Sequence, residues 1–162
     1  GQLQEVQRCL YHQLLRTTED TAFLLPSDCG QEVKARMVNW FLLPPLMEYY
    51  YIRQNSGYQT LPPLKPGCRA ERQWMDVVYP PQQATIYQPV DYEGRLNPVV
   101  FEAIHRDQSA VIYWHLDNSF LGLTKDGRHQ FVMPEAAPGQ HVLSLVDEHG
   151  NSVSRSFKLA RK

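Results

Sequence analysis

The feature that most constrains the fold is a series of short apolar runs in residues 75–162, each followed by proline, glycine, asparagine or aspartate. Short apolar runs separated by such turn residues predict β-strands rather than helices. Seven or eight strands are expected, because candidate runs cover residues 76–79, 85–87, 98–104, 110–116, 120–123, 130–133, 141–146 and 153–159. The chain is therefore predicted to be mainly β.

Alternation within the last two runs predicts which of their faces are buried. Residues 153–159 alternate apolar side chains and Arg155 with serines and a lysine, so one face of that strand is expected to lie in a core. Residues 142–146 are largely apolar on both faces, which suits the centre of a sheet. The spacing and the alternation together predict an immunoglobulin-like β-sandwich with Trp114 buried, and without the usual disulfide between its sheets because no cysteine follows Cys68.

Residues 1–74 differ in character and are predicted to form a small subdomain ahead of a sandwich domain of residues 75–162. A hairpin is expected around residues 17–20. A short helix is predicted for residues 46–54, which follow a proline pair and carry apolar side chains at helical spacing. Residues 61–67 hold three prolines and are expected to form an extended, Pro-rich spacer outside the core.

Three cysteines, Cys9, Cys29 and Cys68, all lie in this first part and are disulfide candidates. Cys9 and Cys29 flank the expected hairpin and would face each other across it. The alternative pairing joins Cys29 to Cys68. Because the number is odd, one cysteine stays free or bonds to another chain, and an oxidising compartment is expected. Three buried, reduced thiols in a cytosolic protein are the competing interpretation.

Charge and hydropathy exclude several partners. Sixteen Lys and Arg against seventeen Asp and Glu give a formal charge of −1, so the chain generates no field that would attract nucleic acid. The longest apolar run, residues 41–47, is interrupted by two prolines and is far shorter than the roughly 20 residues that span a bilayer. We expect no nucleic-acid partner and no segment that crosses a membrane.

The sequence contains no pattern typical of catalysis. It has no Gly-x-Ser-x-Gly or Ser-x-x-Lys motif, its six histidines are scattered, and its glycines form no phosphate-binding loop. We expect no catalytic residue, no cofactor and no metal site. Aromatic side chains are the remaining recognition feature: Tyr50, Tyr51 and Trp114 are expected to pack internally, whereas the candidates for an exposed binding surface are Tyr87, Tyr92 and Phe120.

Several motifs resemble, in order, the C-terminal domain of the penicillin-binding protein 1C family. They are VYPP (78–81), TIY (85–87), IYWHLDN (112–118) with LG (121–122), and PGQHVLSLVD (138–147). The preceding WFLLPPLMEYYY (40–51), LPP (61–63) and Cys68 resemble the linker that follows the transpeptidase domain, particularly in Bacteroidetes-like members. The resemblance covers nearly the whole chain, less securely over residues 1–30.

The resemblance implies that the chain is a piece of a longer protein, anchored in the inner membrane, that polymerises glycan strands and cross-links stem peptides on the periplasmic side. None of the transpeptidase or glycosyltransferase motifs has a matching position here, so the fragment is expected to be soluble, periplasmic and non-enzymatic. The implied function is a non-catalytic interaction or positioning module of this bifunctional peptidoglycan synthase. It would contact its own transpeptidase domain or a periplasmic partner such as an alpha-2-macroglobulin-like protein. The alternative is a carbohydrate-binding module that contacts peptidoglycan glycan strands through exposed aromatic rings.

Overall fold

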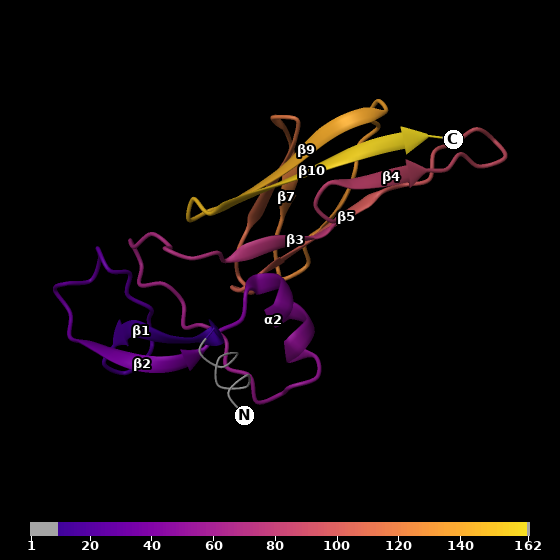
Figure 1. Ribbon diagram of the computed structural model, residues 1–162. Helices are drawn as coiled ribbons and strands as arrows, with labels where there is room; N and C mark the ends of the chain where they lie inside the picture. The colour runs from indigo at the N-terminus through magenta and orange to yellow at the C-terminus, as the bar shows by residue number, and fades with distance from the viewer. Residues whose placement is uncertain (1–9, 162) are drawn as a thin grey trace. The chain divides into compact units, whose positions relative to one another are not determined.

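A computed structural model describes residues 10–161 and divides the chain into two compact units that meet between Trp74 and Met75. The first unit holds two strands, a short helix and long irregular segments, whereas the second is built mainly from β-strands (Figure 1). The expectation of a mainly β protein is confirmed. Each unit is described by itself below.

The first unit contains a two-stranded antiparallel sheet and a helix. Strands β1 (His12–Thr18) and β2 (Ala35–Phe41) pair over their full length. Helix α2 (Pro45–Ile52) begins at the proline pair, because proline supplies the φ angle of a first helical turn and that turn does not use its missing N–H. The predicted short helix is confirmed, with its end two residues earlier than expected.

The predicted hairpin is present only as a local reversal of the chain. The backbone N–H of Thr18 donates to the carbonyl oxygen of Phe23 at 3.0 Å, and an isolated bridge joins Thr17 to Leu24. The main partner of β1 is instead β2, which lies beyond the cysteine-containing loop. Strand β2 is longer than the segment after the reversal and offers β1 more backbone hydrogen bonds.

The first unit's disulfide joins Cys29 to Cys68, with a Cα–Cα distance of 5.9 Å. The preferred pairing of Cys9 with Cys29 was therefore wrong, and the alternative pairing is the one present; Cys9 lies outside the described residues. The physical reason lies in Arg16, whose guanidinium donates to the carbonyl oxygens of Cys29 at 2.8 Å and Pro26 at 2.9 Å. These bonds hold the Cys29 loop in place beside β1, and the chain returns to it at Cys68.

The Pro-rich segment packs into the unit and is not a detached spacer. The backbone N–H of Leu24 donates to the carbonyl oxygen of Pro63 at 2.8 Å, and that of Lys65 donates to the carbonyl oxygen of Leu24 at 3.0 Å. Leu61 is 7% exposed, and it belongs to a core made by Leu15, Leu24, Leu42, Leu61 and Trp74. Extended backbone leaves its polar groups free to pair with a neighbouring segment, and proline spacing alone does not reveal this.

The second unit contains all eight predicted strands. They are β3 (Met75–Tyr79), β4 (Ala84–Gln88), β5 (Val100–His105), β6 (Ile112–Leu116), β7 (Ser119–Thr124), β8 (Gln130–Val132), β9 (Gly139–Asp147) and β10 (Ser152–Arg161). One sheet has the order β4-β10-β9-β6-β7 and the other the order β3-β5-β8. Strand β4 pairs with β10 in parallel, and the other pairs are antiparallel.

The core of the second unit lies between these two sheets. Phe101 from the smaller sheet stacks on Trp114 from the larger one at a centroid distance of 6.4 Å, and it meets Phe157 edge-on at 5.7 Å. All three side chains are fully buried. The prediction of a sandwich with Trp114 in its core is confirmed, and β9 occupies the centre of its sheet as expected, although Val142 on its outer face is 40% exposed.

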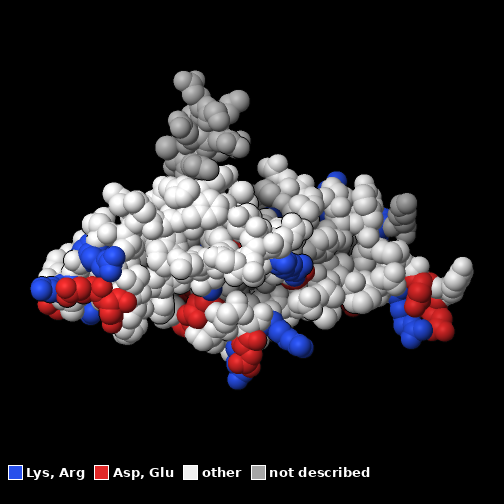
Figure 2. Space-filling model, turned by 90° about the horizontal axis from the view of Figure 1, so that it is seen from below, with Lys and Arg blue, Asp and Glu red and all other residues white. Residues whose placement is uncertain are grey.

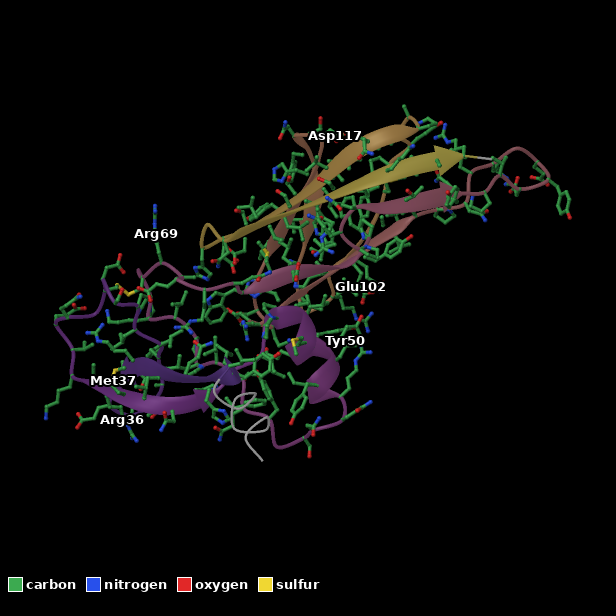
Figure 3. All side chains as sticks on the ribbon, viewed as in Figure 1. Arg36, Met37, Tyr50, Arg69, Glu102 and Asp117 are labelled. Carbon is green, nitrogen blue, oxygen red and sulfur yellow. A yellow bond between two sulfur atoms is a disulfide. The ribbon has the colours of Figure 1, made fainter. Side chains whose placement is uncertain are left out.

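A tight turn joins β6 to β7 at the edge of the larger sheet. Asp117 and Asn118 both have positive φ angles, 50° and 68°, as a type I′ hairpin turn requires. The Asp117 carboxylate also accepts a hydrogen bond from the backbone N–H of Val142 at 2.8 Å, which ties the turn to β9 (Figure 3). The hairpin predicted at this position is therefore fixed by both backbone and side-chain contacts.

Candidate functional site

The three predicted surface aromatics are exposed but lie in different places. Tyr87 on β4 is 63% exposed, Phe120 on β7 is 59% exposed, and Tyr92 is fully exposed in the loop after β4. Strands β4 and β7 form opposite edges of the five-stranded sheet, so Tyr87 and Phe120 are separated by four strand spacings, roughly 19 Å. The fold does not bring these rings together around one ligand.

Phe120 lies in an apolar patch on the outer face of the larger sheet. Its ring centroid is 5.5 Å from that of His115 and 6.5 Å from that of Tyr113. Cross-strand pairing places Leu123, which is 47% exposed, opposite Tyr113. We call Tyr113, His115, Phe120, Leu123 and Val142 the outer patch. Because β6 is hydrogen-bonded to β7 on one side and to β9 on the other, the patch is held on rigid strands.

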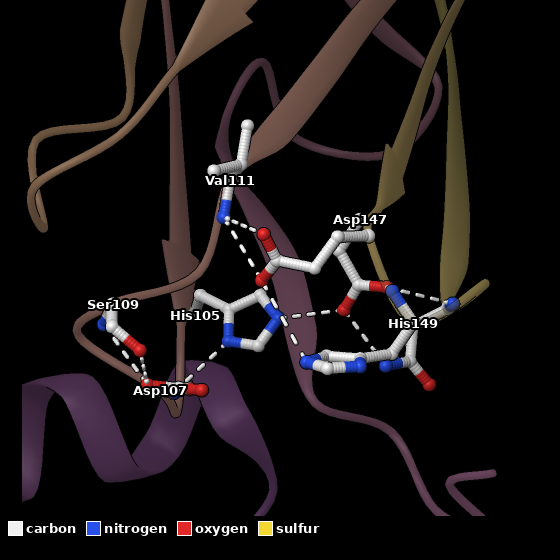
Figure 4. Close-up of polar contacts among 8 residues, drawn as sticks. His105, Asp107, Ser109, Val111, Asp147 and His149 are labelled. Atoms are coloured by element: carbon white, nitrogen blue, oxygen red, sulfur yellow. Dashed lines mark hydrogen bonds and ion pairs between the residues drawn. The ribbon is translucent and has the colours of Figure 1, made fainter. Parts of the chain in front are cut away.

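A histidine and an aspartate form a fully buried acid–base pair in the second unit (Figure 4). His105 Nε2 lies 2.8 Å from Asp147 Oδ2, and the backbone N–H of Asp107 donates to His105 Nδ1 at 2.9 Å. The Nδ1 atom therefore accepts a hydrogen bond, and Nε2 carries the ring proton and donates a hydrogen bond to the Asp147 carboxylate. The nearby Ser109 hydroxyl donates to Asp107 rather than to the histidine. Both ring nitrogens are occupied, so this pair supports the fold and does not activate a nucleophile.

Asp147 also caps the turn between β9 and β10. Its carboxylate accepts the backbone N–H groups of His149 and Asn151 and the Asn151 side-chain amide, at 2.7–2.9 Å. Burial alone would raise the pKa of Asp147, but the hydrogen bonds from His105 and Asn151 outweigh it, and the pKa lies below its usual value. The carboxylate is thus held ionised by its donors.

A second buried polar chain runs from Trp114 through Thr124 to His129. The indole Nε1 donates to Thr124 Oγ1 at 2.8 Å, and this oxygen lies 2.7 Å from His129 Nδ1. Burial and the neighbouring His105 lower the pKa of His129 to about 4, so its ring is neutral at physiological pH. Through Thr124, the chain gives the buried indole N–H of Trp114 and the Nδ1 atom of His129 a hydrogen-bond partner inside the second unit.

The first unit holds a groove that the sequence analysis did not anticipate. It has a volume of about 350 Å³ and is lined by Asn39, Trp40 and Phe41 of β2, and by Tyr51, Asn55, Gly57, Tyr58 and Gln59 of α2 and the loop after it. We call it the aromatic groove. Tyr51 was expected to pack internally but is 38% exposed, and Tyr50 beside it on α2 is 53% exposed (Figure 3). The only sequence signal was the closeness of two aromatic runs, residues 40–41 and 49–51.

Charge and metal-binding potential are low over the described surface. Figure 2 shows basic and acidic side chains beside one another in small clusters on the face it presents. Opposite charges also pair in the loop after β4, where Arg95 lies 3.3 Å from Asp91. Within residues 10–161, no group of three or more His, Cys, Asp or Glu side chains could hold a metal ion. In the same range, no helix has the length and hydropathy needed to cross a bilayer.

The second unit has two facing, mostly antiparallel sheets with a buried tryptophan between them, which defines it as a β-sandwich of the immunoglobulin and fibronectin type III class. The model of the Penicillin-Binding Protein C-terminus Family matches residues 65–157, more than half of the chain. The chain belongs to this family, in agreement with the motifs found in its sequence. It is thus a non-catalytic accessory domain of a penicillin-binding protein, a protein class of the cell envelope.

Solved structures with related folds include the fibronectin(III)-like modules of Clostridium thermocellum CbhA. This match has 12% identity and a TM-score of 0.40, and it covers 54% of this chain and 95% of that one. Extracellular domains 3–5 of Drosophila OTK match at 13% identity and a TM-score of 0.36, covering 57% of this chain and 36% of that one. No curated protein sequence matches the chain.

Proposed function

We propose that the chain is the C-terminal positioning module of a bifunctional peptidoglycan synthase of the penicillin-binding protein 1C type, on the periplasmic side of the inner membrane. It would hold the synthase in a working arrangement by docking on its transpeptidase domain. Membership in the Penicillin-Binding Protein C-terminus Family supports the placement in a penicillin-binding protein. The exposed outer patch is the observation that supports docking on another domain.

The outer patch has the composition of a protein interface. Phe120, Leu123 and Val142 are 40–59% exposed on strands that cannot easily rearrange, and aromatic anchors on rigid elements dominate many interfaces. A partner in the same polypeptide is favoured because covalent linkage raises the effective concentration to the millimolar range, so a patch of modest size suffices. An alpha-2-macroglobulin-like periplasmic protein or peptidoglycan itself would be the competing partner.

Hydrogen exchange tests the proposal. Amides of β6 and β7 should exchange more slowly in the full-length synthase than in the isolated 162-residue chain, because docking covers them. Phe120→Ser should remove that protection, whereas Tyr87→Ser, a comparably exposed aromatic on the opposite edge, should leave it intact. Equal exchange in both forms, or protection that needs a second protein, would contradict docking on the transpeptidase domain.

A further inference from the structure

The aromatic groove belongs to the first unit and the outer patch to the second, and no part of the proposed function uses the groove. From its chemistry, we infer that it binds an uncharged N-acetylated saccharide, the chemistry of the glycan strands in the cell wall. The site would make the accessory domain a reader of glycan as well as a positioning module, and it differs from the Tyr87, Tyr92 and Phe120 surface considered first.

The rings of the groove are arranged for stacking on a sugar. Phe41, Tyr51 and Tyr58 contact one another edge-on, with centroid distances of 5.6–6.0 Å. In each edge-on pair the C–H edge of one ring points at the electron-rich π-face of the other, so a ring can offer a ligand only a face that its neighbours leave uncovered. The C–H groups on one side of a pyranose carry partial positive charge and pack against such a face. Tyr51, at 38% exposure, offers the largest open ring.

The groove is held in shape before any ligand arrives. The Tyr58 hydroxyl donates to the buried carboxylate of Glu48 at 2.5 Å and accepts the backbone N–H of Leu43 at 3.3 Å. The Trp40 indole donates to the carbonyl oxygen of Gln59 at 3.2 Å, which ties β2 to the loop after α2. A ligand therefore meets a preformed surface and spends little of its binding energy on ordering it.

The polar lining selects the charge and type of ligand. Among the residues that the structure describes, no charged side chain lines the groove, and the polar side chains outside the rings are the amides of Asn39, Asn55 and Gln59. An amide both donates and accepts, which matches sugar hydroxyl and acetamido groups, whereas phosphates and carboxylates select Arg or Lys. The volume of about 350 Å³ is near the lower end of the roughly 300–1,000 Å³ of small-molecule sites. It therefore fits a short stretch of a glycan chain.

A proline-rich peptide is the chief competing ligand, because such peptides also dock in aromatic-lined grooves. A polyproline helix presents carbonyl acceptors but few donors, and would use the amide side chains only as donors. The Asn55 amide nitrogen already donates to the carbonyl oxygen of Tyr51 at 3.0 Å, which leaves the side-chain oxygens of the lining as acceptors. Saccharide hydroxyl groups can donate to these oxygens and proline residues cannot, so the lining favours the saccharide.

Titration of the 162-residue chain with an N-acetylglucosamine tetrasaccharide, followed by tryptophan fluorescence, tests the inference. Trp40 lines the groove, while Trp74 and Trp114 are 5% and 0% exposed, so a saturable change reports mainly on Trp40. Tyr51→Ala should raise the Kd about tenfold through loss of stacking. Tyr50→Ala is the matched control, since it removes an exposed tyrosine from the next position of α2 without touching the groove, and it should leave the Kd unchanged.

Two further variants separate loss of saccharide binding from loss of stability. Gln59→Ala changes an exposed loop side chain and should weaken binding several-fold with no loss of stability, even where Tyr51→Ala loosens the ring cluster. Phe120→Ser should bind the tetrasaccharide normally, so failure of the docking proposal is distinguishable from failure here. No saturable change up to millimolar saccharide, an equal loss in Tyr50→Ala, or a response to a proline-rich peptide but not to the saccharide would overturn the inference.

Discussion

Replacing Asp147 by alanine should destabilise the second unit strongly. The side chain is fully covered at the end of β9 and accepts four hydrogen bonds, from His105, from the backbone N–H groups of His149 and Asn151, and from the Asn151 amide. Alanine removes the acceptor and leaves the proton on His105 Nε2 without a partner in a buried site. The substitution therefore combines lost bonds with the cost of an unsatisfied donor.

The size of the effect follows from these contacts. Leaving the neutral His105 donor unsatisfied in a buried site costs about 1–3 kcal/mol, and a hydrogen bond to a charged carboxylate contributes about 1.5–3 kcal/mol. The turn amides can reach water once the carboxylate has gone, so we expect about 3–5 kcal/mol in total, mostly from the His105 donor. Asp147→Asn keeps one acceptor oxygen and should cost about 1–3 kcal/mol.

Acid should reduce this contribution. The pKa of Asp147 is lowered in the folded protein, so its stabilisation is fully present above the unfolded value of about 3.9 and is lost as the pH falls through the folded pKa. The difference between the natural chain and Asp147→Asn should accordingly be largest near neutral pH and shrink below about pH 4.

Urea denaturation followed by the indole N–H signal of Trp114 measures the second unit alone, because Trp114 is its one tryptophan. Glu93→Ala serves as the control, since it removes an exposed loop carboxylate and should change the free energy of unfolding by less than about 0.5 kcal/mol. A loss below about 1 kcal/mol for Asp147→Ala would refute the assignment of a buried, fully used carboxylate.

Three further predictions concern stability. Replacing Cys29 and Cys68 by serine should cost the first unit about 4 kcal/mol in urea denaturation, because the bond closes a loop with a sequence separation of 39; a loss under about 1 kcal/mol would argue against the pairing. Gly122→Ala should lower the free energy of unfolding of the second unit by about 1–3 kcal/mol and so lower its Tm, since the new Cβ would lie 2.9 Å from the ring of Phe131. An unchanged Tm would show that the ring moves aside without cost. Because the pKa of His129 is lowered to about 4 in the folded protein, the free energy of unfolding should fall by about 3 kcal/mol as the pH is lowered from about 6.5 to 4. His129→Gln should remove most of this pH dependence, and an equal pH dependence in both proteins would contradict the prediction.

The strands of the second unit were predictable because their signals are local. Alternation in residues 153–159 and the turn residues Asp117 and Asn118 act within a few positions of the strands they define, and β7 and β10 formed where expected. The order of the strands was not predictable in the same way. Pairing of β4 with β10 separates Tyr87 from Phe120 across the sheet, and no short-range pattern encodes that pairing.

The first unit was harder to predict for the same reason. Its disulfide depends on a Pro-rich segment folding back onto Leu24, and its groove depends on residues 55–59 returning to the end of β2. Tyr51 is a tyrosine in an apolar run, which favours burial when only the sequence is considered. Its exposure follows from the direction in which α2 leaves the proline pair, and that direction is a tertiary property.

The place of β10 has a consequence for how this domain can be synthesised and shortened. Strand β10 lies between β4 and β9, so among the strands of the larger sheet the last to be synthesised fills an inner position. The nascent chain therefore cannot complete that sheet until residues 152–161 have left the exit tunnel. A premature stop codon ahead of them would strip β4 of its ladder and open the sandwich, whereas loss of an edge strand such as β7 would leave the remaining ladders paired.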